Sequence, residues 1–426
     1  MRAQLIKSVR KLGVKKTLDF KVNHPDHNFY AEGIVVSNSH SASYGYLTAI
    51  TAYFKANHPK EFFLSLLKNA QNESEPLVEV NKIQKELKWF GVELLPPCLL
   101  KGNIDFRIEN NNIRFGLNSI KGLAESALNK LQSFKPENCN KFEMFQAAKQ
   151  AGLSCGVMAS LIMSGALDVF VSETRNKLSF ECLLFSRLKD KEKIYCLNQA
   201  KLGNTDLISL IKNIIEWTDS LGKKVARKTR LNTLRKDTLK YQEIYKLNSQ
   251  YEQLCNWWFE NELLGFAYSS NLKSIFSKSG REDIINLSQF KHEIEPNNSG
   301  IIICQLREFK TSVSKKGNNM MKIFVSDETD NNYFYFAGDS YKNYLTEQEI
   351  DNKPNLKEKD IIAIKVMKSK DGSGGFVQKL TVQSQKIYCK LADLKDLPVE
   401  ESENIIPAAP LPEQTENPDQ FELKLT

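Results

Sequence analysis

The run GIIICQLREF at residues 300–309 decides the fold of the second half of the chain, together with four shorter runs that follow it. Each run is rich in β-branched and aromatic residues, and Gly or polar residues separate one run from the next. Five short strands joined in this way are typical of a small β-barrel. The other four runs are MKIFVSD (321–327), NYFYFAG (332–338), DIIAIKVM (360–367) and GFVQKLTV (375–382).

The chain ahead of this barrel has mainly helical patterning. Apolar residues recur at helical spacing from Tyr44 to Phe54, and Pro59 is placed to begin the next helix. A short β segment, NIRFGL, and two helical pieces follow between about 103 and 170, and residues 171–290 are mainly helical. The predicted fold class is therefore multidomain α+β.

Composition narrows the class of protein. A chain of 426 residues predicts about three folding units. With 41% hydrophobic and 26% charged residues, and no run of ~18 apolar residues, we expect no membrane segment. The first residues lack the apolar block of a secretory signal. The eight cysteines are scattered without a CxxC pair, which indicates reduced thiols in a cytoplasmic protein and no structural zinc.

The charge is distributed unevenly along the chain. The net charge is +8 overall and −7 over residues 391–426, which leaves +15 for residues 1–390. A basic body suits a polyanionic partner, although the same charge is also common on an ordinary solvated surface. The acidic tail is rich in proline, and this composition predicts disorder.

The first forty residues predict a β hairpin followed by a reactive peptide bond. TLDFKV (17–22) and EGIVV (32–36) are two short β-rich runs that flank a polar segment. Two strands do not form a stable core alone, so we expect them to belong to a larger β-structure. Beyond them, the Asn38 side-chain amide is able to attack its own carbonyl and break the chain before Ser39, whose hydroxyl accepts acyl groups.

Upstream residues complete this reactive arrangement. His27 is suited to moving protons, and Asp19 is placed to orient it. The segments TLDFKVNHPDHNF (17–29) and HNFYAEGIVVSN (27–38) resemble the carboxy-terminal half of a split intein. Many inteins have His before the final Asn, whereas this chain has Ser37. The resemblance implies trans-splicing with a partner chain; a degenerate hairpin with an accidental Asn-Ser pair is the alternative.

The sequence after Ser39 resembles the carboxy-terminal part of the bacterial DNA polymerase III alpha subunit, the C-family replicative polymerase. The similar phrases occur in family order, which is more specific than any one of them. They are SHSASYGYLTAITAYFKANHPKEFFLSLL (39–67), GVELLPPCL (91–99), IRFGLNSIKGLAESAL (113–128), LIMSGALDVF (161–170) and NELLGFAYSSNL (261–272).

The resemblance implies sites in the fingers and in a helix-hairpin-helix region. Residues 39–54 resemble the finger helix that approaches the incoming nucleotide, and His40 and Tyr44 would face that nucleotide. The alternative is that both are packing residues on an amphipathic helix. IKGLAES resembles a hairpin turn whose backbone amides approach a DNA phosphate, with Lys121, Gly122 and Ser126 as the contacts. Ala124 occupies the place of a second Gly, and a left-handed Ala is strained.

The barrel resembles the single-strand-binding OB fold that follows these hairpins in the family. Such folds stack bases on aromatic side chains along a basic groove. Because neighbouring residues of a strand face opposite sides, only one pair of the run 333–336 lines the groove, and we expect it to be the two tyrosines. The candidate DNA contacts are Arg307, Phe309, Lys315, Lys316, Lys322, Tyr333 and Tyr335.

Two further segments resemble nucleic-acid and protein contacts. The stretch LGKKVARKTRLNTLRKDTLK (221–240) has eight Lys and Arg against one Asp, and it is either a duplex-facing helix or a solvated one. Its candidate phosphate contacts are Lys223, Lys224, Arg227, Lys228 and Arg230. The terminal QFELKLT resembles the peptide that docks replication proteins on the sliding clamp, through Gln420, Leu423 and Leu425.

No carboxylate pair suited to two-metal catalysis is evident in this chain. Asp327 and Asp330 lie in SDETDNN, which reads as a turn. The resemblance implies that the palm aspartates and their Mg²⁺ belong to an amino-terminal partner chain, and that no cofactor binds here. DNA synthesis on primer-template DNA would then follow splicing. The alternatives are a non-catalytic DNA-binding accessory with an inactive intein, and a general single-strand binder.

These interpretations divide the chain into six predicted segments. The split-intein fragment precedes the fingers, the helix-hairpin-helix region and a helical basic region, and the OB fold and the tail follow. Their boundaries are 1–38, 39–102, 103–170, 171–298, 299–388 and 389–426.

Overall fold

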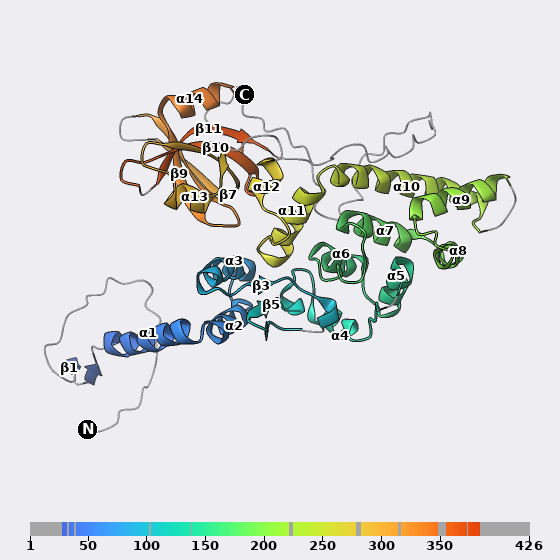
Figure 1. Cartoon of the computed structure of the whole chain (residues 1–426), viewed down its shortest axis with the longest axis horizontal. Coiled ribbons are helices and arrows are strands. Elements are labelled where there is room, and N and C mark those ends of the chain that lie inside the picture. The colour runs from blue at the N-terminus through green and yellow to red at the C-terminus, as the bar shows by residue number, and fades with distance from the viewer. Residues whose placement is uncertain are drawn as a thin grey trace. The chain divides into compact units, whose positions relative to one another are not determined.

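The computed structural model describes ten stretches of the chain, and every structural statement below concerns them. They are residues 28–31, 34–37, 40–101, 104–137, 139–220, 225–277, 283–313, 317–347, 355–372 and 374–383. The chain divides into two compact units, Met1–Phe62 and Phe63–Thr426. Figure 1 traces the elements of both in chain order.

The first unit contains a hairpin and a helix. Strands β1 (Asn28–Ala31) and β2 (Ile34–Ser37) pair antiparallel, with Asn28 opposite Ser37. The strand predicted in EGIVV is confirmed. Its partner in the structure is Asn28–Ala31, which was not predicted because polar residues precede it. The other predicted strand, residues 17–22, lies outside the described residues. Helix α1 (His40–Asn57) follows, and α2 (Pro59–Ala70) begins at the predicted proline and continues into the second unit.

The first part of the second unit is a small sheet surrounded by helices. Strand β5 lies between β3, with which it is parallel, and β4, with which it is antiparallel. Where two helical pieces were predicted, three form, and side-chain caps begin two of them: Asn140 caps α5 and Ser154 caps α6. The bounds are α3 Pro76–Leu87, β3 Leu94–Leu95, β4 Arg107–Glu109, β5 Asn112–Arg114, α4 Glu125–Leu131, α5 Lys141–Gln150 and α6 Cys155–Met163.

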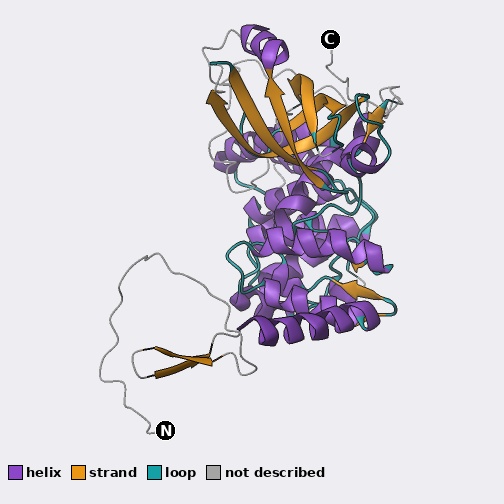
Figure 2. Ribbon diagram, turned by 90° about the vertical axis from the view of Figure 1, so that its left-hand side faces the viewer, coloured by secondary structure: helices purple, strands orange, loops and turns teal. Residues whose placement is uncertain are grey.

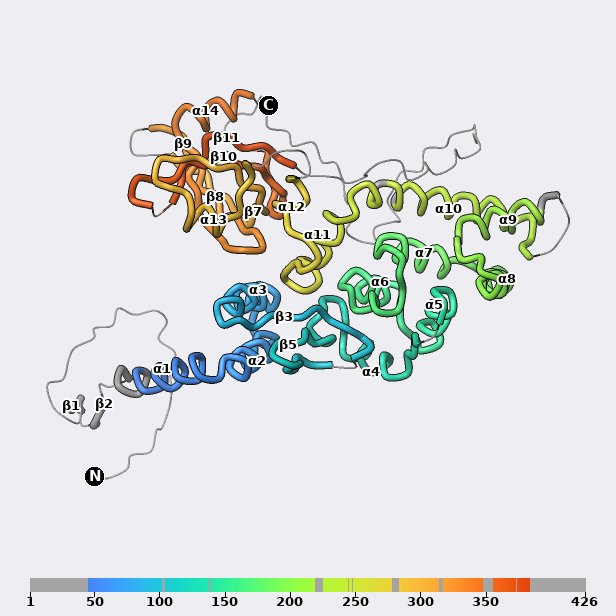
Figure 3. The backbone as a smooth tube through the Cα atoms, viewed as in Figure 1, coloured from blue at the N-terminus to red at the C-terminus, as the bar shows by residue number. Residues whose placement is uncertain are grey.

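The next part is helical, as predicted for residues 171–290. Helices α9 and α10 pack side by side, and α7 contacts both α6 and α10 (Figure 3). The bounds are α7 Arg175–Arg187, α8 Asp190–Lys201, α9 Leu207–Ser220, α10 Lys228–Ser249, α11 Glu252–Leu264 and α12 Leu272–Ser277. None of the helices in the described stretches is both long and apolar enough to cross a membrane.

An ion network around the buried Arg175 fixes α7 against the turn after α6 and the end of α11. The Arg175 guanidinium donates to Asp168 at 2.5 Å and to Glu260 at 2.6 Å, and it also donates to the Tyr268 hydroxyl at 2.7 Å. Glu260 is fully buried and accepts the backbone amide of Tyr268 through its other oxygen. The phrases LIMSGALDVF and NELLGFAYSSNL therefore meet in one packed junction.

The carboxy-terminal part of the second unit is a closed barrel of five strands. The order around it is β7-β8-β9-β11-β10, and β10 pairs back to β7 to close the barrel. Three strands form a meander, α14 follows, and β11 lies parallel to β9. This order defines the OB fold. The bounds are β6 Ile284–Ile285, α13 Leu287–His292, β7 Ser299–Val313, β8 Asn319–Ser326, β9 Asn331–Ala337, α14 Gly338–Glu347, β10 Ile361–Lys368 and β11 Gly375–Val382.

Two apolar clusters explain the strand sequences. The barrel interior contains Ile302, Ile364 and Phe334, all fully buried. A second cluster packs α11 and α12 on the outer side of β7 and β10, where Ile303 and Ala363 are buried. Because β7 and β10 are covered on both sides, their sequences are continuous apolar runs instead of alternating ones. Figure 2 shows most of the strands gathered in one body, and Figure 1 labels α14 beside the barrel strands.

The turn between β8 and β9 joins the barrel to the helices. The Trp257 indole of α11 donates to the Glu328 carboxylate, and so does the Leu272 amide, at 3.1 Å. Burial, together with the neighbouring Asp327, raises the pKa of Glu328 to about 7. From α3, the Lys85 ammonium donates to the Asp330 carbonyl at 3.0 Å, and burial lowers the pKa of Lys85 to about 8.

Candidate nucleic-acid interface

The outer side of β8, β9 and β11 is the barrel face that α11 and α12 do not cover. Strand register sets Lys322 of β8 opposite Tyr335 of β9, and Tyr335 opposite Phe376 of β11. Two residues further along the same pair of strands, Phe324 of β8 lies opposite Tyr333 of β9. Since side chains two apart on a strand face the same side, these five residues share one surface, which we call the aromatic face.

The aromatic face carries exposed rings and a cation. Tyr333, Tyr335 and Phe376 are 45%, 38% and 48% exposed. The Tyr333 ring stacks on Phe324 with ring centroids 4.4 Å apart. The Lys322 ammonium lies 4.1 Å from the centroid of the Tyr333 ring and 5.8 Å from that of Tyr335. The cation is thus held over two rings, where their π-electrons attract it.

Such a surface suits an unpaired nucleic-acid strand. Flat exposed rings stack on bases whatever their identity, and an adjacent ammonium attracts the phosphates. In OB folds this face of the second and third strands is the usual oligonucleotide surface. Lys310, opposite Lys322 on β7, extends the positive charge, although it also pairs with Glu308 at 2.6 Å.

The alternation predicted for residues 333–336 is confirmed. Both tyrosines are exposed, whereas Phe334 and Phe336 are fully buried. Phe334 meets Phe290 of α13 edge to face, and Phe336 packs on Tyr341 of α14. The two tyrosines of β9 therefore lie on its outer side and the two phenylalanines on its core side, as the pattern predicted. DNA contact by the tyrosines stays a prediction.

Two other barrel candidates lie away from this face. Arg307 occupies a bulge in β7, where its guanidinium donates to Ser326 at 2.7 Å and burial lowers its pKa. Phe309 is half-buried and packs against the barrel core. The structure does not support either as a free stacking or phosphate contact, because packing and hydrogen bonding already use them. Lys315 and Lys316 lie outside the described residues.

Phe324 and Phe376 were not among the DNA contacts predicted from the sequence. Phe324 lies between the apolar Ile323 and Val325 in MKIFVSD. If those two side chains face the core, strand alternation places the Phe324 side chain on the outer side. Phe376 is the second residue of β11, and no local signal in the sequence shows that β11 lies beside β9. Only the closed strand order brings its ring next to Tyr335.

The predicted hairpin turn is exposed before α4. Gly122 has a φ of +92°, a conformation that favours glycine. Ala124 is the residue before α4 and is extended, with φ −72° and ψ 160°, so the expected strain of a left-handed Ala is absent. Lys121 and Ser126 are exposed, and the Lys121 ammonium lies 3.5 Å from Glu262. Phosphate contact by these residues stays a prediction.

The basic stretch is only partly available. Arg227 and Lys228 are exposed at the start of α10. Arg230 is instead held inside the helical part, because its guanidinium donates to the Arg187 carbonyl at 2.8 Å and lies 3.6 Å from Glu192. Its assignment as a phosphate contact is therefore corrected to a bridge between helices. Lys223 and Lys224 lie outside the described residues.

Several other predicted residues lie where the structure gives no side-chain description. His40 and Tyr44 are in α1, but only their backbone is described. The proposed splicing and clamp-binding residues are outside the described stretches: Asp19, His27, Asn38, Ser39, Gln420, Leu423 and Leu425.

The carboxylates of the β8–β9 turn do not fit a metal site. Asp327 accepts the amides of Thr329 at 2.7 Å and Asp330 at 2.9 Å through one oxygen, and that of Leu287 at 2.6 Å through the other. The Asp330 carboxylate pairs with Lys291 at 3.0 Å. Elsewhere in the described stretches, no group of three or more His, Cys, Asp or Glu side chains is arranged to hold a metal ion.

Comparison with known proteins gives relatives for part of the chain. A family model described as a helix-hairpin-helix motif matches residues 91–178. DNA polymerase III subunit alpha of Aquifex aeolicus is 35% identical over 150 residues, which are 33% of this chain and 12% of that protein. The same subunit of Bacillus subtilis is 22% identical over 297 residues, 69% of this chain and 23% of that protein. The chain thus spans less than a quarter of these relatives.

Among solved structures, a domain of replication protein A from Methanococcus maripaludis matches 24% of this chain and 97% of that domain, at 16% identity and a TM-score of 0.19. A TM-score of 0.19 is too low to support a fold assignment, so the assignment of the OB fold is based on the strand order of the barrel. The sequence matches, however, establish a relationship: this chain is related, over part of its length, to the DNA polymerase III alpha subunit, and it contains a helix-hairpin-helix motif.

Proposed function

We propose that this chain is the carboxy-terminal portion of a replicative DNA polymerase III alpha subunit and supplies its DNA-binding part. The observation that carries the proposal is the similarity to alpha subunits from several bacteria, in a chain that also presents the aromatic face. An enzyme of this class adds deoxynucleotides to a primer 3′ end in the cytoplasm.

In this proposal the second unit grips DNA at two kinds of surface. The aromatic face stacks the bases of the unpaired template strand, with Lys322 beside the phosphates. The exposed turn around Lys121 and Gly122, with Ser126, contacts a backbone phosphate. Arg227 and Lys228 add charge toward the duplex. These contacts position DNA and do not read its sequence.

The remaining parts of the enzyme come from a partner chain. Helix α1 leaves Tyr46, Leu47, Tyr53 and Phe54 exposed, at 70%, 54%, 58% and 47%. Exposed apolar side chains of this number on one helix are typical of a surface that another protein covers. The partner would supply the palm carboxylates and their Mg²⁺, which the turn carboxylates of this chain do not replace, so this chain alone should not extend primers.

Trans-splicing is the proposed route of joining. Asn38 would cyclise and release residues 1–38, with His27 and Asp19 assisting proton transfer. Ser39 would accept the partner's acyl group and then pass it to its own freed amine, which leaves an ordinary peptide bond. The carboxy-terminal residues Gln420, Leu423 and Leu425 would dock on the sliding clamp.

Binding of a fluorescent oligodeoxythymidine, followed by anisotropy, tests the DNA-binding proposal. Losing one stacked base costs roughly 1–3 kcal/mol, so Tyr335→Ala should weaken binding about 5- to 150-fold. Tyr335→Phe keeps the ring and should bind within about twofold of wild type. Equal affinity of Tyr335→Ala and wild type would remove the aromatic face from the proposal.

Mixing the chain with a partner that carries the palm and an amino-terminal intein half tests the joining step. Mass spectrometry should show a released 38-residue piece and one ligated product, and Asn38→Ala should abolish the release. A ligated product that extends primers supports the polymerase. Stable association without any ligation would instead favour a non-catalytic accessory with an inactive intein.

A further inference from the structure

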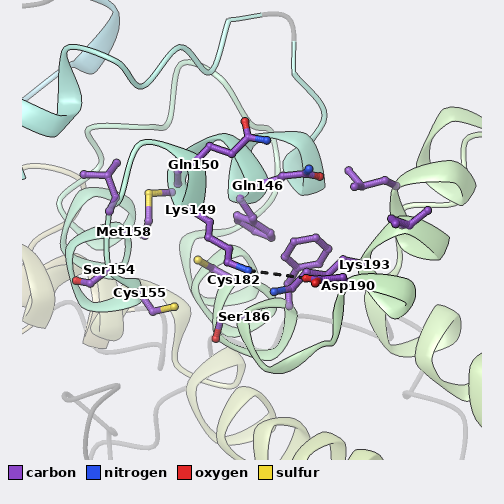
Figure 4. Close-up of a pocket in the computed structure, with 16 residues that line it drawn as sticks. Gln146, Lys149, Gln150, Ser154, Cys155, Met158, Cys182, Ser186, Asp190 and Lys193 are labelled. Carbon is purple, nitrogen blue, oxygen red and sulfur yellow. Dashed lines mark ion pairs between the residues drawn. The ribbon is translucent and has the colours of Figure 1, made fainter. Parts of the chain in front are cut away.

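A cavity of about 540 Å³ lies among α5, α6, α7 and α8, away from the aromatic face. Its walls are mainly apolar, and its volume is within the range of small-molecule sites. Figure 4 shows two cysteines on one side and the ion pair of Lys149 with Asp190 on the other, with oxygen and nitrogen 4.0 Å apart. The apolar lining includes Phe145, Met158, Phe185, Ile194 and Leu197.

Cys155 is the accessible nucleophile of this cavity. It is the first residue of α6 and follows the capping Ser154, so its sulfur lies at the positive end of the helix. Its side chain is partly exposed, whereas Cys182 of α7 is buried behind it. Both cysteines line the cavity, and the Cys182 thiol favours the ionised form of Cys155.

The surroundings of Cys155 favour its thiolate. The hydrogen bond from Cys182 is the main cause that lowers the pKa of Cys155 to about 6, with smaller contributions from Ser186 and from the charges of Lys193 and Arg187. The facing carboxylate, Asp190, is paired with Lys149. At neutral pH most of the Cys155 population is therefore ionised, and the thiolate is the form of cysteine that attacks electrophiles.

Cys139 is an internal comparison within the same chain. Like Cys155 it is partly exposed, but it lies outside the cavity. Burial and the neighbouring Glu143 raise the pKa of Cys139 above its ordinary value of 9.0. The environment of each thiol, and not its exposure, therefore distinguishes the two.

We propose that Cys155 is a covalent-modification site for apolar α,β-unsaturated carbonyl compounds that bind in this cavity. The Cys155 sulfur adds to the β-carbon of the compound, forming a C–S bond as the carbon–carbon π bond breaks. The α-carbon takes a proton from water, which replaces the proton that the thiol gave to solvent. The reaction is an addition without any oxidant or leaving group.

The cavity fits both ends of such a compound. The aromatic and aliphatic walls bury its apolar body. Negative charge develops on the carbonyl oxygen during the addition, and the ammonium groups of Lys149 and Lys193 line the same cavity, where they stabilise that charge. A small polar electrophile would gain nothing from the walls, so preference for an apolar body is the property that identifies the site.

Competition between cysteines of the intact chain tests the proposal. The chain is treated at pH 6 with N-ethylmaleimide or N-phenylmaleimide, quenched, digested, and each cysteine is followed by mass spectrometry. At pH 6 about half of Cys155 is thiolate, against about one part in a thousand for a thiol with a pKa of 9. After allowance for the lower intrinsic nucleophilicity of a low-pKa thiol, Cys155 should react about 20-fold faster than Cys139.

Two comparisons separate the nucleophile from the cavity. Cys182→Ala removes the hydrogen bond and should slow Cys155 about two- to sixfold at pH 6, whereas Cys182→Ser, which keeps a donor, should not. The ratio of N-phenylmaleimide to N-ethylmaleimide rates should be higher at Cys155 than at Cys139. Equal rates at the two cysteines, or a fast Cys155 with no preference for the phenyl compound, would overturn the proposal.

Discussion

Glu328→Gln should stabilise the protein above neutral pH, although it removes a charged residue from a hydrogen-bonded position. In the folded chain the Glu328 carboxylate accepts the Trp257 indole and the Leu272 amide, but burial and Asp327 disfavour its ionised form. A glutamine has nearly the same shape and keeps one acceptor oxygen for these donors. The substitution therefore removes the cost of the charge with little change in packing.

The magnitude follows from the pKa of Glu328, which is 4.5 ordinarily and about 7 in the fold. The folded chain binds this proton more tightly than the unfolded chain, so the contribution to stability is fully present below pH 4.5 and is lost as the pH rises through 7. Each pKa unit corresponds to about 1.4 kcal/mol. Between pH 5 and pH 8, the free energy of unfolding of Glu328→Gln should rise by about 2 to 3 kcal/mol relative to wild type.

Urea denaturation of both proteins at pH 5, 6, 7 and 8, followed by tryptophan fluorescence, measures this difference. Glu109→Gln is a control without a slope in this range, because the hydrogen bond to Arg114 lowers the pKa of Glu109 from 4.5 to about 2. The stability that the Glu109 charge contributes is already fully present above pH 4.5, so that variant should differ from wild type by a constant amount from pH 5 to pH 8. A difference between Glu328→Gln and wild type that stays constant from pH 5 to pH 8 would refute the reasoning about Glu328.

Three further substitutions test the junctions and the aromatic face. Arg175→Met leaves the buried Glu260 without its counter-charge and should cost about 3–5 kcal/mol in urea denaturation; a loss below about 1 kcal/mol would contradict this. Gly265→Ala places a Cβ 2.4 Å from the Leu77 carbonyl at a φ of +86° and should cost at least about 2 kcal/mol, seen as a lower melting temperature; an unchanged melting temperature would count against it. Phe376→Ala should weaken oligodeoxythymidine binding about fivefold or more while Phe376→Tyr does not, and equal affinities would exclude stacking there.

Local patterns in the sequence predicted much of the barrel. Alternation along residues 333–336 placed the tyrosines outside and the phenylalanines inside, because a strand with one covered side repeats every two residues. The five strands were likewise predicted from their β-rich runs. The continuous apolar runs of β7 and β10 mark strands covered on both sides, but the sequence does not show that α11 and α12 provide the outer cover.

Features that depend on distant partners were not predictable. The basic sequence around Arg230 predicts a DNA contact, but its partner in the fold, Glu192, lies 38 positions away. Phe376 joins the aromatic face only because β11 pairs with β9. Cys155 and Cys182 line one cavity because α6 packs on α7, and the spacing of the two cysteines in the sequence does not predict this.

The apolar cluster that seats α11 and α12 on β7 and β10 has a mechanical consequence. The barrel packs directly on its neighbouring helices, through Trp257 of α11, Ile303 of β7 and Ala363 of β10. This packing sets how the aromatic face is oriented relative to α11 and α12. A nucleic-acid strand bound on the aromatic face would therefore have one fixed orientation relative to α11 and α12.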